Sequence, residues 1–107
     1  GRKGGESMSV LLIATLDTKG AEAAFVRDRL RAAGVPVLVA DAGVAGPPTE
    51  PADIPRAELY AAGGYDVAAL ASTADRGKAV AAAAVAAGKL GAKLHSEGKL
   101  TGVFGLG

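Results

Sequence analysis

Two short, uninterrupted apolar runs most strongly limit what this chain can fold into. Residues 10–14 and 35–40 are apolar without alternation, and Pro36 stands near the start of the second run. Such runs are typical of strands buried on both faces, as in a parallel sheet covered by helices. Between them, residues 21–33 carry apolar side chains at helical spacing and end before Gly34. The pattern predicts a βαβ unit with a right-handed crossover.

A long loop follows the second run. Residues 41–55 are rich in glycine and proline, and we expect a loop of this length to be functional or mobile. Residues 54–62 then predict a short helix with Pro55 in its first turn, closed by Gly63 and Gly64. Residues 65–72 fit a short strand or an extended loop equally well.

The last third of the chain predicts one long helix and one strand. The helix is expected to start at a cap formed by Thr73 or Asp75, to run to about residue 97 and to end at Gly98. Gly88 and Gly91 weaken it, so we expect a packing reason or a bend there. Its predicted buried stripe consists of Val80, Ala83, Ala87, Leu90 and Leu94.

Residues 100–106 are expected to form the third strand. The predicted fold class is therefore α/β: a three-layer, Rossmann-like half domain with a short parallel sheet, in strand order 2-1-3, flanked by helices.

Charge and composition exclude several classes of function. Twelve basic and eleven acidic residues give a net charge of +1 without a basic block, which argues against nucleic acid as a partner. There is no cysteine, so disulfide frameworks and thiolate chemistry are excluded. The apolar run 79–87 is shorter than the ~20 residues of a membrane span. We expect a cytoplasmic protein, with residues 1–7 a remnant of expression ahead of a native start at Met8.

The segment after the first strand carries the most polar chemistry. Thr15, Asp17, Thr18 and Lys19 stand between a buried strand and a helix N-terminus, where backbone N–H groups and the helix dipole attract phosphate. An ordinary polar turn, with Asp17 or Thr18 capping the helix, explains the same residues. The spacing is not that of a P-loop.

Further candidate residues follow the other strands or open the long helix. Asp41 ends the second strand, where an acidic residue accepts from a ribose hydroxyl in dinucleotide folds, although a turn-capping role is the simpler interpretation. Arg76 is suited to clamping a phosphate, or else is a solvated charge beside Asp75. The remaining candidates are Gly43, Gly105 and Gly107. No catalytic triad, metal-ligand spacing or carboxylate pair is present, and His95 is expected on the surface.

Taken in order, these segments resemble a known family: the N-terminal ATP-binding domain of the plant tobamovirus-resistance inhibitor and its uncharacterised bacterial and fungal relatives. The resemblance is carried by residues 14–20 (ATLDTKG), 41–44 (DAGV) with the proline-rich loop and Asp53-Ile54, 75–80 (DRGKAV) and 102–107 (GVFGLG). It implies a domain of two Rossmann-like halves that binds ATP, with Mg²⁺ as an accompanying ion, often fused to a C-terminal barrel. It also implies a glycine-rich phosphate loop after Gly107, so that residues 8–107 are the first part of that domain.

The leading hypothesis is a nucleotide-binding module, part of a larger ATP-binding domain and not an enzyme by itself. Its ligand contacts are expected from the nine candidate residues, because parallel strands present their carboxyl ends at one edge. Alternatives are a protein-interaction module that uses loop 41–55, or an accessory domain of an enzyme with a fused barrel. Uncovered strand edges also invite self-association.

Overall fold

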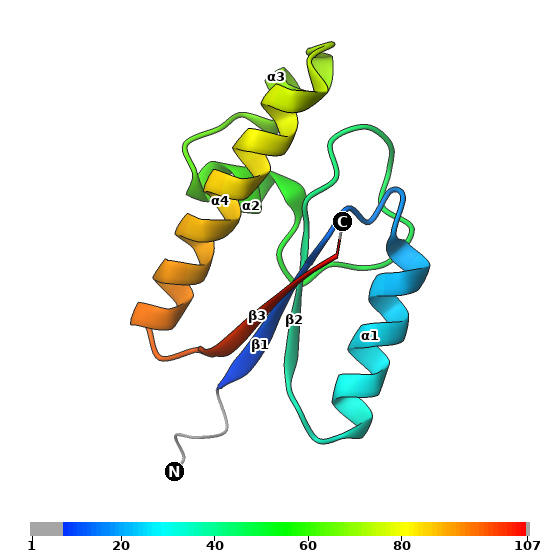
Figure 1. The fold of residues 1–107 in the computed structure, drawn as a ribbon, viewed down its shortest axis with the longest axis vertical. Helices are drawn as coiled ribbons and strands as arrows, with labels where there is room; N and C mark the ends of the chain where they lie inside the picture. The colour runs from blue at the N-terminus through cyan, green and yellow to red at the C-terminus, as the bar shows by residue number, and fades with distance from the viewer. Residues whose placement is uncertain (1–7, 107) are drawn as a thin grey trace.

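The computed structural model describes residues 8–106. In chain order the elements are β1 (Ser9–Ala14), α1 (Gly20–Ala32), β2 (Val37–Asp41), α2 (Arg56–Ala62), α3 (Val67–Ser72), α4 (Arg76–Ser96) and β3 (Leu100–Leu106). The three strands form one parallel sheet in the order β2-β1-β3 (Figure 1). The predicted α/β class and strand order are confirmed. The expectations for residues 1–7 and for Gly107 fall outside the described residues.

β1 is the centre of the sheet and separates two apolar clusters. Leu11 belongs to a cluster with side chains of α2, α3 and α4, whereas Leu12 belongs to a cluster with side chains of α1. Successive residues of a strand point to opposite faces, so the uninterrupted apolar run supplies both clusters at once. Figure 1 shows the same layers, with α1 on one side of the sheet and α2 and α4 on the other.

The buried stripe of α4 differs from the predicted one. Leu90 and Leu94 are buried as expected, but the stripe continues through Ala86 and Ala82, and Val80 is 67% exposed. Alanine occurs on nearly every side of this helix, so hydrophobicity alone barely distinguishes its faces. Within residues 8–106, the structure contains no helix long and apolar enough to cross a membrane.

Residues 67–72 form a helix, so both the predicted strand and the extended loop are wrong for them. Asp66 begins α3 as its N-cap, and its side chain accepts a hydrogen bond from the backbone N–H of Ala68. Asp75 caps α4 in the same way by accepting from the backbone N–H of Lys78, which settles the choice between Thr73 and Asp75. Gly34 and Gly98 follow the ends of α1 and α4 at φ +83° and +72°, as glycine stop signals do.

Two helical glycines of this fold are expected to respond oppositely to alanine. A Cβ on Gly20 would overlap Oγ1 of Thr49, whose hydroxyl donates to the carbonyl of Leu16. Gly20→Ala is therefore expected to lower the free energy of unfolding by about 1–3 kcal/mol. Gly88→Ala meets no atom within 4 Å and is expected to raise it, by up to about 1 kcal/mol. Urea denaturation measures both, and stabilisation by Gly20→Ala would contradict the tight packing.

Candidate functional site

A cleft of about 410 Å³ opens at the carboxyl ends of β1 and β2. Four segments line it: the turn between β1 and α1, the residues that follow β2, Tyr60 of α2, and the first turns of α4. Of the nine predicted residues, the cleft brings together Thr15, Asp17, Thr18, Lys19, Gly43 and Arg76. Ala42, Val44, Tyr60, Ala79, Val80 and Ala83 contribute most of its apolar wall. The cleft therefore combines two cationic side chains and two hydroxyls with an apolar part of its lining.

The three other predicted residues do not line this cleft. Asp41 lies beneath it and is buried. Gly105 pairs with Ile13 near the end of β3, which places it at the same edge of the sheet. Gly107 lies beyond the part of the chain that the structure describes.

The turn between β1 and α1 is held by its own backbone and hydroxyl groups. The carbonyl of Thr15 accepts from the N–H groups of Thr18 (3.1 Å) and Lys19 (2.7 Å), and the two threonine hydroxyls lie 2.8 Å apart. Lys19 occupies the N-cap position of α1, and no side chain caps the helix. The prediction of Asp17 or Thr18 as cap is therefore wrong. The uncapped N–H groups of the first turn remain available to another acceptor.

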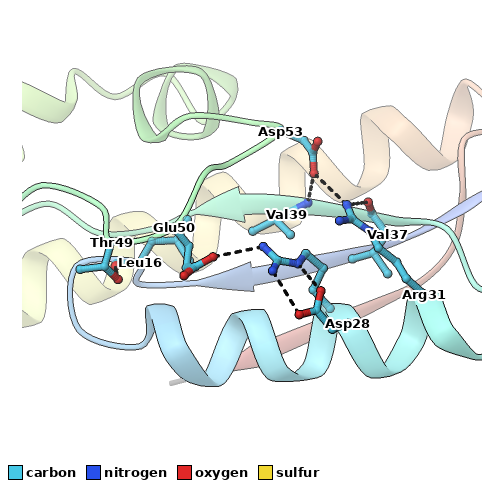
Figure 2. A network of polar contacts seen from close by, with 9 residues as sticks. Leu16, Asp28, Arg31, Val37, Val39, Thr49, Glu50 and Asp53 are labelled. Carbon is cyan, nitrogen blue, oxygen red and sulfur yellow. Dashed lines mark hydrogen bonds and ion pairs between the residues drawn. The ribbon is translucent and has the colours of Figure 1, made fainter.

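Asp17 holds the proline-rich loop instead. Its Oδ2 accepts from the backbone N–H groups of Ala45 (3.3 Å) and Gly46 (3.1 Å). Further along the loop, the N–H and hydroxyl of Thr49 both donate to the carbonyl of Leu16. Figure 2 shows this contact together with an ion pair from Glu50 to α1 and the hydrogen bond from Val39 to Asp53. The loop is thus fastened to the rest of the fold along much of its length.

Arg56 is the residue that sequence analysis missed. Asp41 is 1% exposed; its Oδ1 accepts from the N–H groups of Leu16 (3.1 Å) and Gly43 (2.8 Å), and its Oδ2 lies 2.9 Å from Nε of Arg56. The carboxylate thus joins the ends of β1 and β2 to the start of α2. Asp41 takes the turn-capping role that was the simpler interpretation of its place in the sequence. The only sequence signal for Arg56 is a basic residue after the proline that opens α2.

Gly43 lies where no side chain fits. A Cβ there would approach Asp17 Oδ1 to 2.7 Å and Arg56 Nη2 to 3.0 Å. These two atoms are buried and have no hydrogen-bond partner in the described structure. Glycine at this position lets the floor of the cleft pass between two charged groups, and any side chain would displace one of them.

Tyr60 completes the floor of the cleft. Its hydroxyl donates to the carbonyl of Ala42 at 2.6 Å. Burial of the ring raises the pKa of Tyr60 above its ordinary value of 10.0, and the negative charge of Asp41 raises it further. The folded state therefore disfavours the phenolate.

This shift predicts a loss of stability in alkali. Well below pH 10 the Tyr60 hydroxyl is neutral in the folded and the unfolded state, so its contribution to stability is complete. As the pH rises through the unfolded-state pKa, the unfolded chain loses the hydroxyl proton first, and the free energy of unfolding falls. Tyr60→Phe is expected to cost about 0.5–1.5 kcal/mol at neutral pH through the lost hydrogen bond. Between about pH 9 and pH 11, the free energy of unfolding measured in urea should then decline less steeply for the variant than for the parent. Parallel declines would contradict the assignment.

Comparison with known proteins places the chain in a family. A family model described as the N-terminal domain of an uncharacterised protein family, UPF0261, matches residues 8–107. A UPF0261 protein of Clostridium tetani (strain Massachusetts / E88) is 30% identical over 98 residues, which are 92% of this chain and 24% of the relative. The chain thus spans about a quarter of the length of that relative. No solved structure matches the chain significantly.

Proposed function

The chain belongs to the UPF0261 family, and we propose that it binds a nucleotide, ATP, in the cleft above the carboxyl ends of β1 and β2. The observation that carries the proposal is the convergence of Lys19 and Arg76 on one cleft from the first turns of two different helices. A polyanion meets two positive charges there, and Lys19, which lines the cleft, is also the N-cap of α1, whose N-terminus favours negative charge. Ligands of parallel α/β sheets bind at this edge.

The apolar side of the cleft suits the base of a nucleotide. Val80 is exposed although it is a large apolar side chain, and it shares the cleft with Val44 and Ala83. A planar base gains by covering such a surface, whereas a free phosphate does not. This combination of walls favours a nucleotide over inorganic phosphate as the ligand.

Asp41 has a supporting role in this proposal. Both carboxylate oxygens of Asp41 accept hydrogen bonds from within the fold, so Asp41 fixes the backbone beneath the cleft. A direct contact between Asp41 and the ribose stays a prediction. Gly105 and Gly107 remain proposed phosphate contacts, as does the glycine-rich loop that the resemblance places after them. The specific kinship with the plant tobamovirus-resistance inhibitor likewise rests on that resemblance.

Magnesium is proposed to accompany the nucleotide. Asp17 is the only acidic residue that the described part of the chain contributes to the cleft lining, and its Oδ2 already accepts two backbone hydrogen bonds. Among the described residues, no group of three acidic, histidine or cysteine side chains is placed to hold a metal. Asp17 Oδ1 is buried beside Gly43 and Arg56, so the described residues offer no free carboxylate ligand within the cleft, and the proposed ion would be held by the phosphates and water.

Calorimetric titration with Mg-ATP tests the proposal through charge removal. Lys19→Ala and Arg76→Ala are each expected to weaken binding by about 10- to 100-fold, because a hydrogen bond to a charged group contributes about 1.5–3 kcal/mol. Lys78→Ala is the matched control, since Lys78 is exposed at the same helix start but does not line the cleft.

The Lys78→Ala control distinguishes binding in the cleft from general electrostatic attraction of the nucleotide. Equal weakening by all three substitutions would indicate only the response of a polyanion to net charge. Unchanged affinity in Lys19→Ala and Arg76→Ala would remove the cleft as the nucleotide site.

A further inference from the structure

The β2 edge of the sheet is closed by the chain itself. Ile54 forms a parallel bridge with Ala40, and its backbone exchanges hydrogen bonds with Val39 and Asp41. Asp53 Oδ2 accepts from the N–H of Val39 at 2.8 Å, which Figure 2 shows beside Arg31 on the carbonyl of Val37. The expectation that both edges of the sheet are uncovered is therefore wrong for β2.

The β3 edge has the opposite character. No described residue pairs with its outer side, and residues 100–106 contain neither a charge nor a proline. Val103 and Phe104 are 53% and 50% exposed, and as neighbours in a strand they point to opposite faces. Edge strands usually carry charged residues, prolines or bulges that discourage pairing. The register of β3 with β1 shifts near its start, where Thr101 is an extra residue between the pairs of Ser9 and Val10, but over residues 102–106 β3 carries none of these devices.

An apolar groove continues this open edge onto α4. It measures about 450 Å³ and lies between α4 and β3, with Gly88, Gly91 and Val103 among its lining residues. A Cβ on Gly88 would meet nothing within 4 Å, and one on Gly91 only the tip of Val103. The expected packing reason for these glycines is therefore not supplied by the described part of the chain. Of the described residues that line it, His95 is the one that titrates.

We propose that the open edge of β3 is the docking site of a further β-strand, which the C-terminal remainder of the longer family chain supplies. The matched family region is described as an N-terminal domain, and the relative from Clostridium tetani is about four times longer than the part aligned with this chain. A strand added beside β3 would pair its free backbone groups, and because a parallel sheet is covered on both faces, the remainder would cover both Val103 and Phe104. The groove, nearly free of charge, suits an apolar segment.

The test compares this chain with a version continued through its natural C-terminal remainder. Phe104→Lys is expected to lower the folding equilibrium constant of the longer chain by about tenfold or more, because the lysine is buried there, and to change that of the 107-residue chain far less. Phe25→Lys on α1 is the matched control; Phe25 is 63% exposed, and its substitution should act equally in both lengths.

Hydrogen exchange of the unsubstituted chains provides a second readout. The outward-facing amides of β3 are expected to exchange at least about tenfold more slowly in the longer chain. Equal exchange and equal effects of Phe104→Lys in both lengths would overturn the proposal. A dimer of the 107-residue chain that Phe104→Lys dissociates would also overturn it, by making a second copy the occupant. So would a natural protein without a C-terminal remainder.

Discussion

Replacing Arg56 with methionine is expected to lower the free energy of unfolding by about 3–5 kcal/mol, the usual cost of removing one partner of a buried ion pair. Asp41 is 1% exposed, and within residues 8–106 Nε of Arg56 is the only charged donor on its carboxylate. Methionine fills a similar volume, so the loss is mainly electrostatic. Small domains are stable by only about 5–15 kcal/mol, and the variant should be close to its unfolding midpoint in mild urea.

Arg76→Met is the matched control for this experiment. Arg76 is exposed, and its side chain makes no hydrogen bond or ion pair within the described chain, so the same substitution should change stability by less than about 0.5 kcal/mol. Urea denaturation followed by circular dichroism measures both variants. Similar small losses in the two would show that the pair of Asp41 and Arg56 contributes no more than a surface contact.

The strands could be predicted because few structures fit an uninterrupted apolar run. An uninterrupted apolar run such as residues 10–14 needs cover on both faces, and only a central strand of a helix-covered sheet provides it. The glycines at the helix ends were equally informative, because Gly34 and Gly98 adopt positive φ. Strand order then followed from connectivity rules, which leave few arrangements of three parallel strands.

The helices were predicted less well where the residue types do not distinguish a helix from a strand, or one face of a helix from another. Residues 67–72 are mostly alanine, valine and leucine, which occur in strands and helices alike; the informative residue was Asp66, whose carboxylate caps the first turn. In α4 the alanines make several faces equally apolar, so the buried stripe could not be located from periodicity. Its position is set by the close approach of Ala86 to Gly63, which is a tertiary contact.

The candidate site, too, could be predicted from the sequence only in part. Thr15 to Lys19 were predictable as a group, since they are the first polar residues after a buried strand. Asp41 was correctly placed at the end of β2, but its partner Arg56 is 15 residues away across a loop whose path no local pattern specifies. That path depends on Asp17 and Thr49, whose hydrogen bonds join segments about 30 residues apart.

Asp41→Asn is expected to act with opposite signs in two backgrounds. In the parent chain the substitution removes the negative charge that faces Arg56. Nε of Arg56 then meets either an amide N–H₂ group or a weaker acceptor, so the free energy of unfolding should fall by about 2–4 kcal/mol. In Arg56→Met it replaces an unpaired buried carboxylate with a neutral amide. The amide oxygen still accepts from the N–H groups of Leu16 and Gly43, as Asp41 Oδ1 does now. There it should restore about 1–3 kcal/mol.

A double-mutant cycle measured by urea denaturation tests this reversal. The coupling energy is the free energy of unfolding lost by the two single variants together, less that lost by the double variant. If Asp41 and Arg56 matter chiefly as mutual charge compensation, the double variant is more stable than Arg56→Met alone. If Asp41 acts only as a backbone cap, its substitution should have a similar small effect in both backgrounds, because the cap oxygen survives in asparagine. Additive losses would therefore assign the stability to the hydrogen bonds of Leu16 and Gly43, and the floor of the cleft would not depend on Arg56.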